Sequence, residues 1–162
     1  MNIYLRHGND DKHSVYKQDN SLNSSKETEQ AIIKKTKWLI ETYGYPQKIY
    51  SSPFKRCRST LRIMLNVLKN YHNVSIDPCL SRRFVNKEAK NPSVRPTTMQ
   101  YHPPIQENNT HFKARVDKAE ERAKKYHGVT WSITHYLVMK ALCKKHNIIL
   151  PAHMPFLYHV II

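Results

Sequence analysis

Short apolar runs alternate along this chain with segments of helical periodicity, and this alternation is the feature that most restricts the fold. The apolar runs predict strands at residues 2–5, 48–51, 74–80, 129–134 and 156–162. Apolar residues at helical spacing predict helices at residues 24–43, 53–68, 110–126 and 137–145. Because strands joined by helices form parallel sheets that are covered on both faces, we expect an α/β fold, a three-layer α/β/α sandwich with a mostly parallel central sheet.

Helix start and stop signals mark two of these helices. Ser24 and Glu27 have the spacing of a capping box, and Gly44 follows the last residue of that helical pattern. Pro53 occupies a first helical position, where its missing N–H costs nothing. Both signals set the predicted boundaries between strand, turn and helix.

The length of 162 residues fits one domain, and we expect residues 1–162 to form it. Residues 81–109 show no lasting periodicity. Four prolines interrupt that stretch: Pro92, Pro96, Pro103 and Pro104. Since long irregular segments in a compact domain are often functional, we expect a loop excursion over the site.

The chain is strongly basic. Lys and Arg total 27 against 12 Asp and Glu, for a formal net charge of +15. Such a charge attracts anionic partners, which include phosphorylated small molecules, phosphoproteins, nucleic acid and acidic membrane surfaces. The tyrosines form no recognisable base-stacking motif, so nucleic acid is the less favoured partner.

The cysteines and the apolar stretches bear on the cellular compartment. Cys57, Cys79 and Cys143 are widely spaced without a C-x-x-C, so we expect reduced thiols rather than a disulfide framework or a zinc site. No apolar stretch approaches the roughly 18 residues of a membrane span, and no signal-peptide pattern opens the chain. We therefore expect a cytoplasmic protein without a membrane span.

Three of the predicted strands end at residues that can hold phosphate. These are Arg6, His7 and Gly8 after the first strand, Ser51-Ser52-Pro53 leading to Arg56 after the second, and His135 after Thr134. The carboxyl ends of parallel strands form the ligand crevice of a sheet, so these residues should meet there. Arginine offers paired donors to phosphate oxygens, and a neutral histidine can attack phosphorus through a ring nitrogen. The sequence therefore predicts a phosphate pocket with a histidine nucleophile.

The same residues resemble the motifs of a known family, the histidine phosphatase superfamily or phosphoglycerate-mutase-like proteins. The opening strand and Arg6-His7-Gly8 look like its R-H-G motif, and residues 51–60 resemble its S-S-P-x-x-R-C-x-x-T. Further matches are Asp19-Asn20-Ser21-Leu22-Asn23 to a D-x-P-L-T lead, residues 107–116 to E-S-x-x-x-F-x-x-R-V, and Ile133-Thr134-His135 to the second catalytic histidine. The resemblance spans residues 2 to about 143.

This resemblance implies catalytic and substrate-binding roles for individual residues of the matched motifs. His7 would be the nucleophile, with Arg6, Arg56 and His135 as its phosphate-binding partners, and no metal or cofactor is implied. Gly8 and Glu107 belong to the matched motifs and are candidate substrate contacts. Arg82 and Arg83, at the rim of the predicted site, are further candidates because their charges suit an acidic substrate.

One position departs from the family pattern. Where many members carry a glutamate that protonates the leaving group, this chain has Arg82. A general acid contributes roughly 10²- to 10⁴-fold in rate, so efficient turnover would require another group in its place. Candidate replacements are Glu88, Glu107, Asp10 and Asp11. Tyr136 also replaces the small residue that commonly follows the second histidine, which argues against mutase activity on a sugar acid.

These residues together predict a metal-independent phosphatase that hydrolyses phosphomonoesters through a phosphohistidine intermediate. An acidic or phosphoprotein substrate suits the basic surface. Two alternatives stay open: a degenerate module that binds phosphorylated ligands without turnover, which Arg82 motivates, and a nucleic-acid-binding protein, which the net charge motivates.

Overall fold

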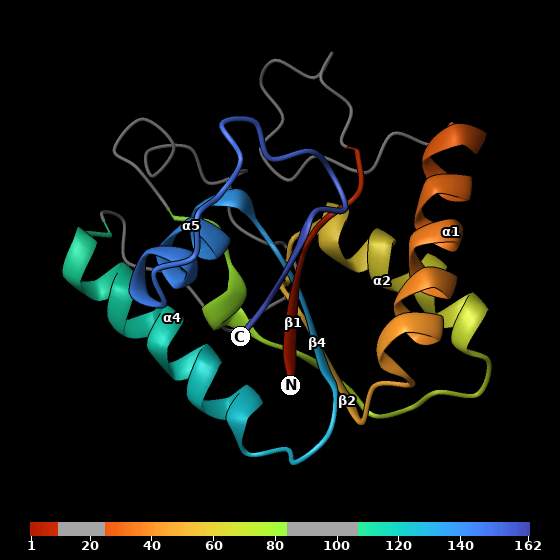
Figure 1. Ribbon diagram of the computed structural model, residues 1–162, viewed down its shortest axis with the longest axis horizontal. Helices are drawn as coiled ribbons and strands as arrows, with labels where there is room; N and C mark the ends of the chain where they lie inside the picture. Colours follow the sequence, from red (N-terminus) through yellow and green to blue (C-terminus); the bar gives the residue numbers. More distant parts are fainter. Residues whose placement is uncertain (10–24, 84–106) are drawn as a thin grey trace.

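A computed structural model describes residues 1–9, 25–83 and 107–162 of the chain (Figure 1). Five of its elements are strands: β1 (Asn2–Arg6), β2 (Lys48–Ser51), β3 (Val74–Ile76), β4 (Thr130–Thr134) and β5 (His159–Ile161). The helices are α1 (Lys26–Tyr43), α2 (Lys55–Leu68), α4 (Asn109–Lys124) and α5 (Tyr136–Lys145), with a 3₁₀ turn, η1 (Pro78–Leu80). Several predictions fall outside the described residues: the Asp19–Asn23 match, Ser24, most of the 81–109 excursion, and the candidate acids Asp10, Asp11 and Glu88.

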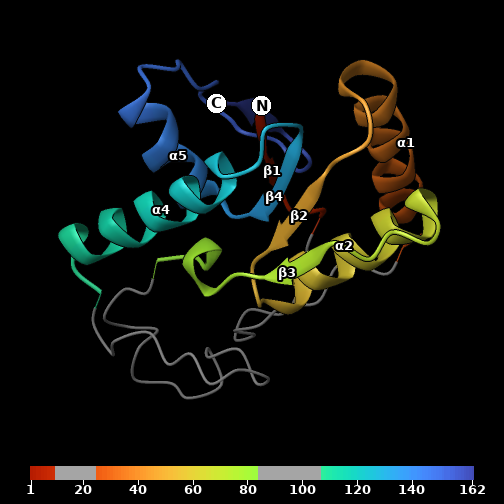
Figure 2. The ribbon, with the colours of Figure 1, turned by 90° about the horizontal axis from the view of Figure 1, so that it is seen from below.

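The strands form one sheet in the order β3-β2-β4-β1-β5. All neighbouring pairs among β1 to β4 are parallel, and β5 alone pairs antiparallel, with β1. Figures 1 and 2 show α1 and α2 on one face of the sheet and α4 and α5 on the other. The predicted three-layer α/β architecture with a mostly parallel sheet is confirmed.

The strand sequences explain why both faces of the sheet are covered. Successive side chains of a strand point to opposite faces, so Ile3 and Leu5 pack toward α1 and α2, whereas Tyr4 packs toward α4 and α5. All three side chains are fully buried. Each large apolar side chain that is buried in this way contributes about 1.5–3 kcal/mol to folding.

Some boundaries differ from the prediction. The cap of α1 is Ser25, whose Oγ accepts the N–H of Thr28 at 3.2 Å, so that the helix begins at Lys26. The strand expected at 74–80 ends at Ile76, because the carboxylate of Asp77 accepts the N–H of Cys79 and turns the chain into η1. The predicted last strand, 156–162, is shortened to β5. No helix in the described part of the chain has the length and apolar content that a membrane crossing requires.

Candidate active site

Sheet order brings three of the predicted motifs to one edge. Because β4 lies between β1 and β2, the residues that follow these strands are neighbours at their carboxyl ends. Backbone bonds join them: the N–H of His7 donates to the carbonyl of Thr134 at 3.1 Å, and the N–H of Ser52 donates to the carbonyl of Ile133 at 2.9 Å. The expected meeting of these strand ends is observed.

The two histidines of these motifs face each other. Their ring centroids are 5.3 Å apart with an angle of 60° between the planes. The exposed fraction is 4% for His7 and 3% for His135. A buried imidazole is held neutral because its charged form loses solvation, so both rings are poised as neutral groups.

The hydrogen bonds of His7 define its tautomer. Its Nδ1 lies 2.7 Å from the carbonyl oxygen of Gly8, which can only accept, so Nδ1 carries the proton and Nε2 keeps its lone pair. Gly8 is fixed in turn, since its N–H donates to Oγ1 of Thr60 at 3.0 Å. Burial first, and then the positive charges of Arg56 and Arg6, lower the pKa of His7 to about 3. Neutral imidazole with a free Nε2 is the form that can act as a nucleophile.

His135 is held in the opposite tautomer. Nη2 of Arg56 donates to its Nδ1 at 3.1 Å, and because a guanidinium has no acceptor, the imidazole proton must be on Nε2. That Nε2–H donates to Oγ of Ser52 at 2.9 Å. Burial lowers the pKa of His135 well below its usual value, and the charges of Arg56 and Arg82 act in the same direction. Ser52, which the sequence placed among the residues that can hold phosphate, is bonded to the second histidine and orients its ring.

Arg56 comes from the first turn of α2, as the sequence predicts. Its side chain is 5% exposed and lies over the ring of Phe54, 5.3 Å from the centroid. Oγ1 of Thr60 donates to the Arg56 carbonyl at 2.8 Å and accepts from Gly8. This chain of bonds couples the helix that carries Arg56 to the turn that carries His7.

The last segment of the chain completes the site beside β1. The guanidinium of Arg6 donates to the Met154 carbonyl and lies 4.3 Å from the ring centroid of Phe156. The same ring lies 5.7 Å from that of His7. The N–H of Leu157, at a φ of 59°, donates to the carbonyl of His7 at 3.4 Å. Phe156 therefore packs against both His7 and Arg6, a role that no local pattern in 156–162 indicated.

Arg82 lies close to the site, whereas Arg83 is engaged beside it. The guanidinium of Arg82 is 6.0 Å from the ring centroid of Phe54, and its charge reaches His135. The Nε–H of Arg83 donates to the backbone carbonyl of Glu107 at 3.4 Å. Arg82 therefore adds to the positive potential of the pocket at the position where the family pattern has an acid.

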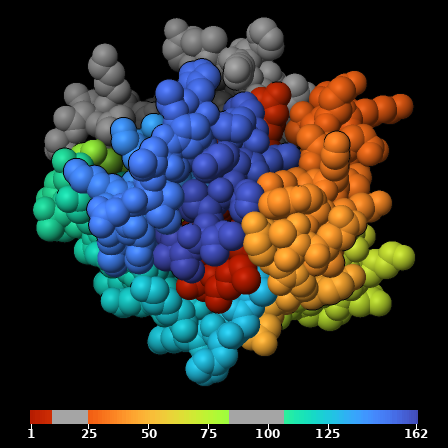
Figure 3. Space-filling model, in the orientation of Figure 1, coloured from red at the N-terminus to blue at the C-terminus, as the bar shows by residue number. Residues whose placement is uncertain are grey.

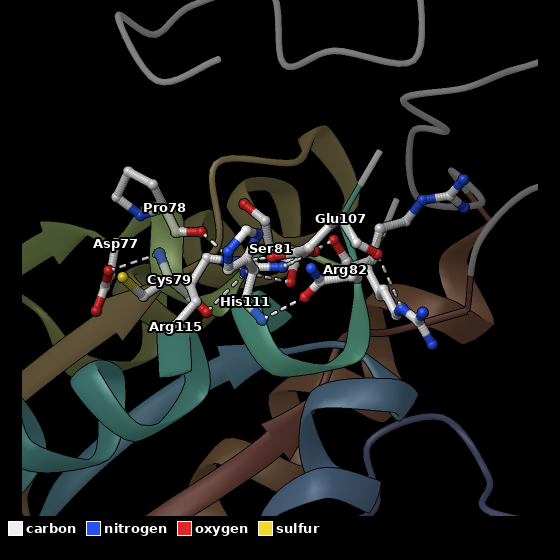
Figure 4. Close-up of polar contacts among 10 residues, drawn as sticks. Asp77, Pro78, Cys79, Ser81, Arg82, Glu107, His111 and Arg115 are labelled. Atoms are coloured by element: carbon white, nitrogen blue, oxygen red, sulfur yellow. Dashed lines mark hydrogen bonds and ion pairs between the residues drawn. The ribbon is translucent and has the colours of Figure 1, made fainter. Parts of the chain in front are cut away.

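The carboxylate of Glu107 is bound by Arg115 (Figure 4). Two bonds of 2.7 and 2.8 Å join the pair, and both side chains are buried. The same guanidinium also donates to backbone carbonyls of η1 and the residues after it: Pro78, Cys79, Ser81 and Arg82. Glu107 thus helps to hold the segment that leads to Arg82, and substrate contact by Glu107 stays a prediction.

Comparison with known proteins places this fold. The sequence matches no family model and no curated protein. Among solved structures, the mycobacterial glucosyl-3-phosphoglycerate phosphatase Rv2419c is 16% identical, with a TM-score of 0.68 over 97% of this chain and 86% of that one. YhfR from Bacillus stearothermophilus is 17% identical, with a TM-score of 0.68 over 96% and 86%. The protein histidine phosphatase SixA, complexed with tungstate, is 14% identical, with a TM-score of 0.58 over 88% and 74%.

The likeness covers nearly the whole chain and extends to the sheet that carries the two histidines. At identities of 14–17% the likeness establishes the fold, and the reaction has to be argued from the site residues. The chain therefore has the fold of the histidine phosphatase superfamily, the phosphoglycerate-mutase-like proteins.

Proposed function

We propose that this protein is a phosphatase that hydrolyses phosphomonoesters through a phosphohistidine on His7. The observation that carries the proposal is the 2.7 Å contact between Nδ1 of His7 and the Gly8 carbonyl, which leaves a neutral Nε2 beside two arginines and a second neutral histidine. Solved structures with this fold include a glucosyl-3-phosphoglycerate phosphatase and a protein histidine phosphatase complexed with tungstate, a phosphate-like oxyanion.

In the first step the substrate phosphate docks against Arg6 and Arg56. Nε2 of His7 attacks phosphorus in line, the bond from phosphorus to the ester oxygen breaks, and the leaving oxygen takes up a proton. Guanidinium groups suit this step because they stabilise the charge on the equatorial oxygens as the transition state forms. His135, through its contact with Arg56, keeps one of these groups in place.

In the second step water attacks phosphorus and the bond to Nε2 breaks. The water gives up its proton, inorganic phosphate is released and His7 returns to its neutral form. The Nδ1–H bond to Gly8 supports both steps, because the phosphorylated imidazole keeps the same donor and the ring need not rotate.

The test is hydrolysis of p-nitrophenyl phosphate. His7→Ala should lower kcat/KM by at least about a thousandfold, since a covalent nucleophile is removed. His127→Ala, on an exposed histidine, is the matched control and should keep full activity. Mass spectrometry of the wild type, quenched during turnover, should show one acid-labile phosphoryl group on His7. Unchanged turnover by His7→Ala would overturn the mechanism.

A second candidate, a module that binds phosphorylated ligands without hydrolysing them, is favoured by the charge of Arg82 beside His135. It predicts tungstate binding by the wild type with no turnover and no phosphohistidine. The same two measurements therefore separate the candidates.

A further inference from the structure

The exposed face of α5 begins at the active site. Tyr136 directly follows His135, and Tyr136 and Leu137 are partly exposed, with exposed fractions of 36% and 38%. Lys140 and Lys144 follow on the same face of the helix at intervals of four residues. Nζ of Lys140 lies 5.9 Å from the ring centroid of Tyr136. Figure 3 shows the residues from 136 onward on the outer surface of the viewed face.

This stripe runs into a groove between α5 and α4. The groove has a volume of about 410 Å³, with Val116 and Ala141 as apolar lining. Lys113 and Lys144 lie at its sides, with Asp117 and Lys145. We call Tyr136, Leu137, Lys140, Lys144 and the groove the α5 track.

The acidic side chains beside this track are already paired. Lys145 binds Asp117 at 2.6 Å and Glu120 at 2.8 Å. Glu120 also accepts from Lys124 and His146.

The other lysines of the track, unlike Lys145, have no acidic partner in the described part of the chain. Within the residues that the structure describes, Lys113, Lys140 and Lys144 form no ion pair, and α5 contains no Asp or Glu. Helix α1, by contrast, carries three glutamates, Glu27, Glu29 and Glu41, beside its lysines. The α5 track is therefore a surface of uncompensated positive charge over an apolar lining.

We propose that the α5 track binds acidic residues that flank the phosphorylated residue of a phosphoprotein substrate. The proposal rests on the phosphatase function given above, because the phosphorylated residue must reach His7 while its neighbours lie on α5. An apolar groove of this size fits peptide side chains, whereas a nucleic-acid backbone offers charge without apolar side chains.

The spacing on the helix sets the expected position of the acidic residues. Along the axis of α5, Lys140 lies about 6 Å and Lys144 about 12 Å beyond Tyr136. An extended peptide advances about 3.3 Å per residue. Acidic residues about two to four positions from the phosphorylated residue should therefore meet the two lysines.

Binding of short fluorescent phosphotyrosine peptides, measured by anisotropy, tests this without requiring turnover. Two pairs of peptides are compared, and each pair consists of a Glu peptide and the same peptide with Gln in place of Glu. In one pair these residues stand two and four positions after the phosphotyrosine, and in the other they stand two and four positions before it. The Glu version of one pair should bind roughly three- to tenfold more tightly than its Gln counterpart, and added salt should remove the difference. The double variant Lys140→Glu/Lys144→Glu should abolish this preference.

The matched control is Lys34→Glu/Lys37→Glu, which changes the same charge on the exposed face of α1 and should keep the preference. Both double variants should hydrolyse p-nitrophenyl phosphate like the wild type, which shows that they fold. Equal binding of Glu and Gln peptides, or a preference that survives the α5 variant, would overturn the α5 track. An unphosphorylated single-stranded oligonucleotide that displaced the peptides from the wild type but not from the α5 variant would also overturn the proposal, in favour of nucleic-acid binding. If the wild type preferred the Glu peptides but did not hydrolyse p-nitrophenyl phosphate, the result would instead count against the phosphatase function.

Discussion

Lowering the pH from 7 to 5 should destabilise this protein through the two histidines of its active site. Both are almost fully buried, and burial together with Arg56 lowers their pKa values, to about 3 for His7 and well below 6.5 for His135. In the unfolded chain the same groups return to about 6.5. Below that pH the unfolded state binds more protons than the folded state, so the stabilisation is complete above pH 6.5 and is lost as the pH falls.

The magnitude follows from this linkage. With its folded pKa near 3, His7 reduces the free energy of unfolding by about 2 kcal/mol between pH 7 and pH 5, and His135, whose folded pKa is also lowered by burial, acts in the same direction. The result depends only weakly on the folded pKa, because the folded imidazole stays neutral across the interval. The contribution of His7 alone corresponds to roughly 4–8 °C in Tm for a domain of this size, and His135 adds to it.

Other titratable groups contribute little to the difference between the wild type and the site variants in the stability lost between pH 7 and pH 5. Burial and Lys35 lower the pKa of His159 to about 4, so His159 adds a similar trend to every variant. Glu120, whose pKa is lowered to about 2, loses its contribution only below about pH 4.5 and stays ionised in this interval.

Urea unfolding at pH 7 and pH 5 measures the effect. His7→Gln should recover about 2 kcal/mol of the loss, and His135→Gln should recover part of it as well, because a neutral amide replaces a group that titrates only in the unfolded chain. His127→Gln, at an exposed position, should show the full loss of the wild type. Equal losses in the wild type and in both site variants would refute the assignment of two buried neutral histidines.

Three further perturbations test the surroundings of the site. Phe156→Ala removes the ring that lies on Arg6 and should raise KM for p-nitrophenyl phosphate roughly three- to tenfold, whereas Phe156→Tyr should not. Glu107→Gln leaves the buried charge of Arg115 without its counter-ion and should cost about 3 kcal/mol in urea unfolding; a raised KM at unchanged stability would instead identify Glu107 as a substrate contact. Ser52→Ala should cost about 1–3 kcal/mol and shift the NMR resonance of the imidazole Nε2 that it binds.

Much of the site could be predicted because its residues follow the strands directly. An apolar run that ends in Arg6-His7-Gly8 indicates both a strand and the chemistry at its end, and the same holds for Thr134 and His135. Parallel strands must present their carboxyl ends at one edge, so the meeting of these residues needs no knowledge of long-range contacts. The strand expected at 74–80 ends early at the turn in which Asp77 accepts the N–H of Cys79, and residues of α4 bond to that turn across the fold.

The sequence by itself determined the strand and helix types, the parallel sheet and the pair of histidines at its edge. Only the tertiary structure decided which groups surround that pair. Phe156 and Met154 contact Arg6 across about 150 positions in the chain, and Glu107 finds Arg115 rather than an open pocket. Local patterns record periodicity and turn chemistry, whereas these contacts depend on strand order and on the packing of buried charges. For that reason the sequence indicated the pair of histidines, whereas the groups that hold them in place were not visible in it.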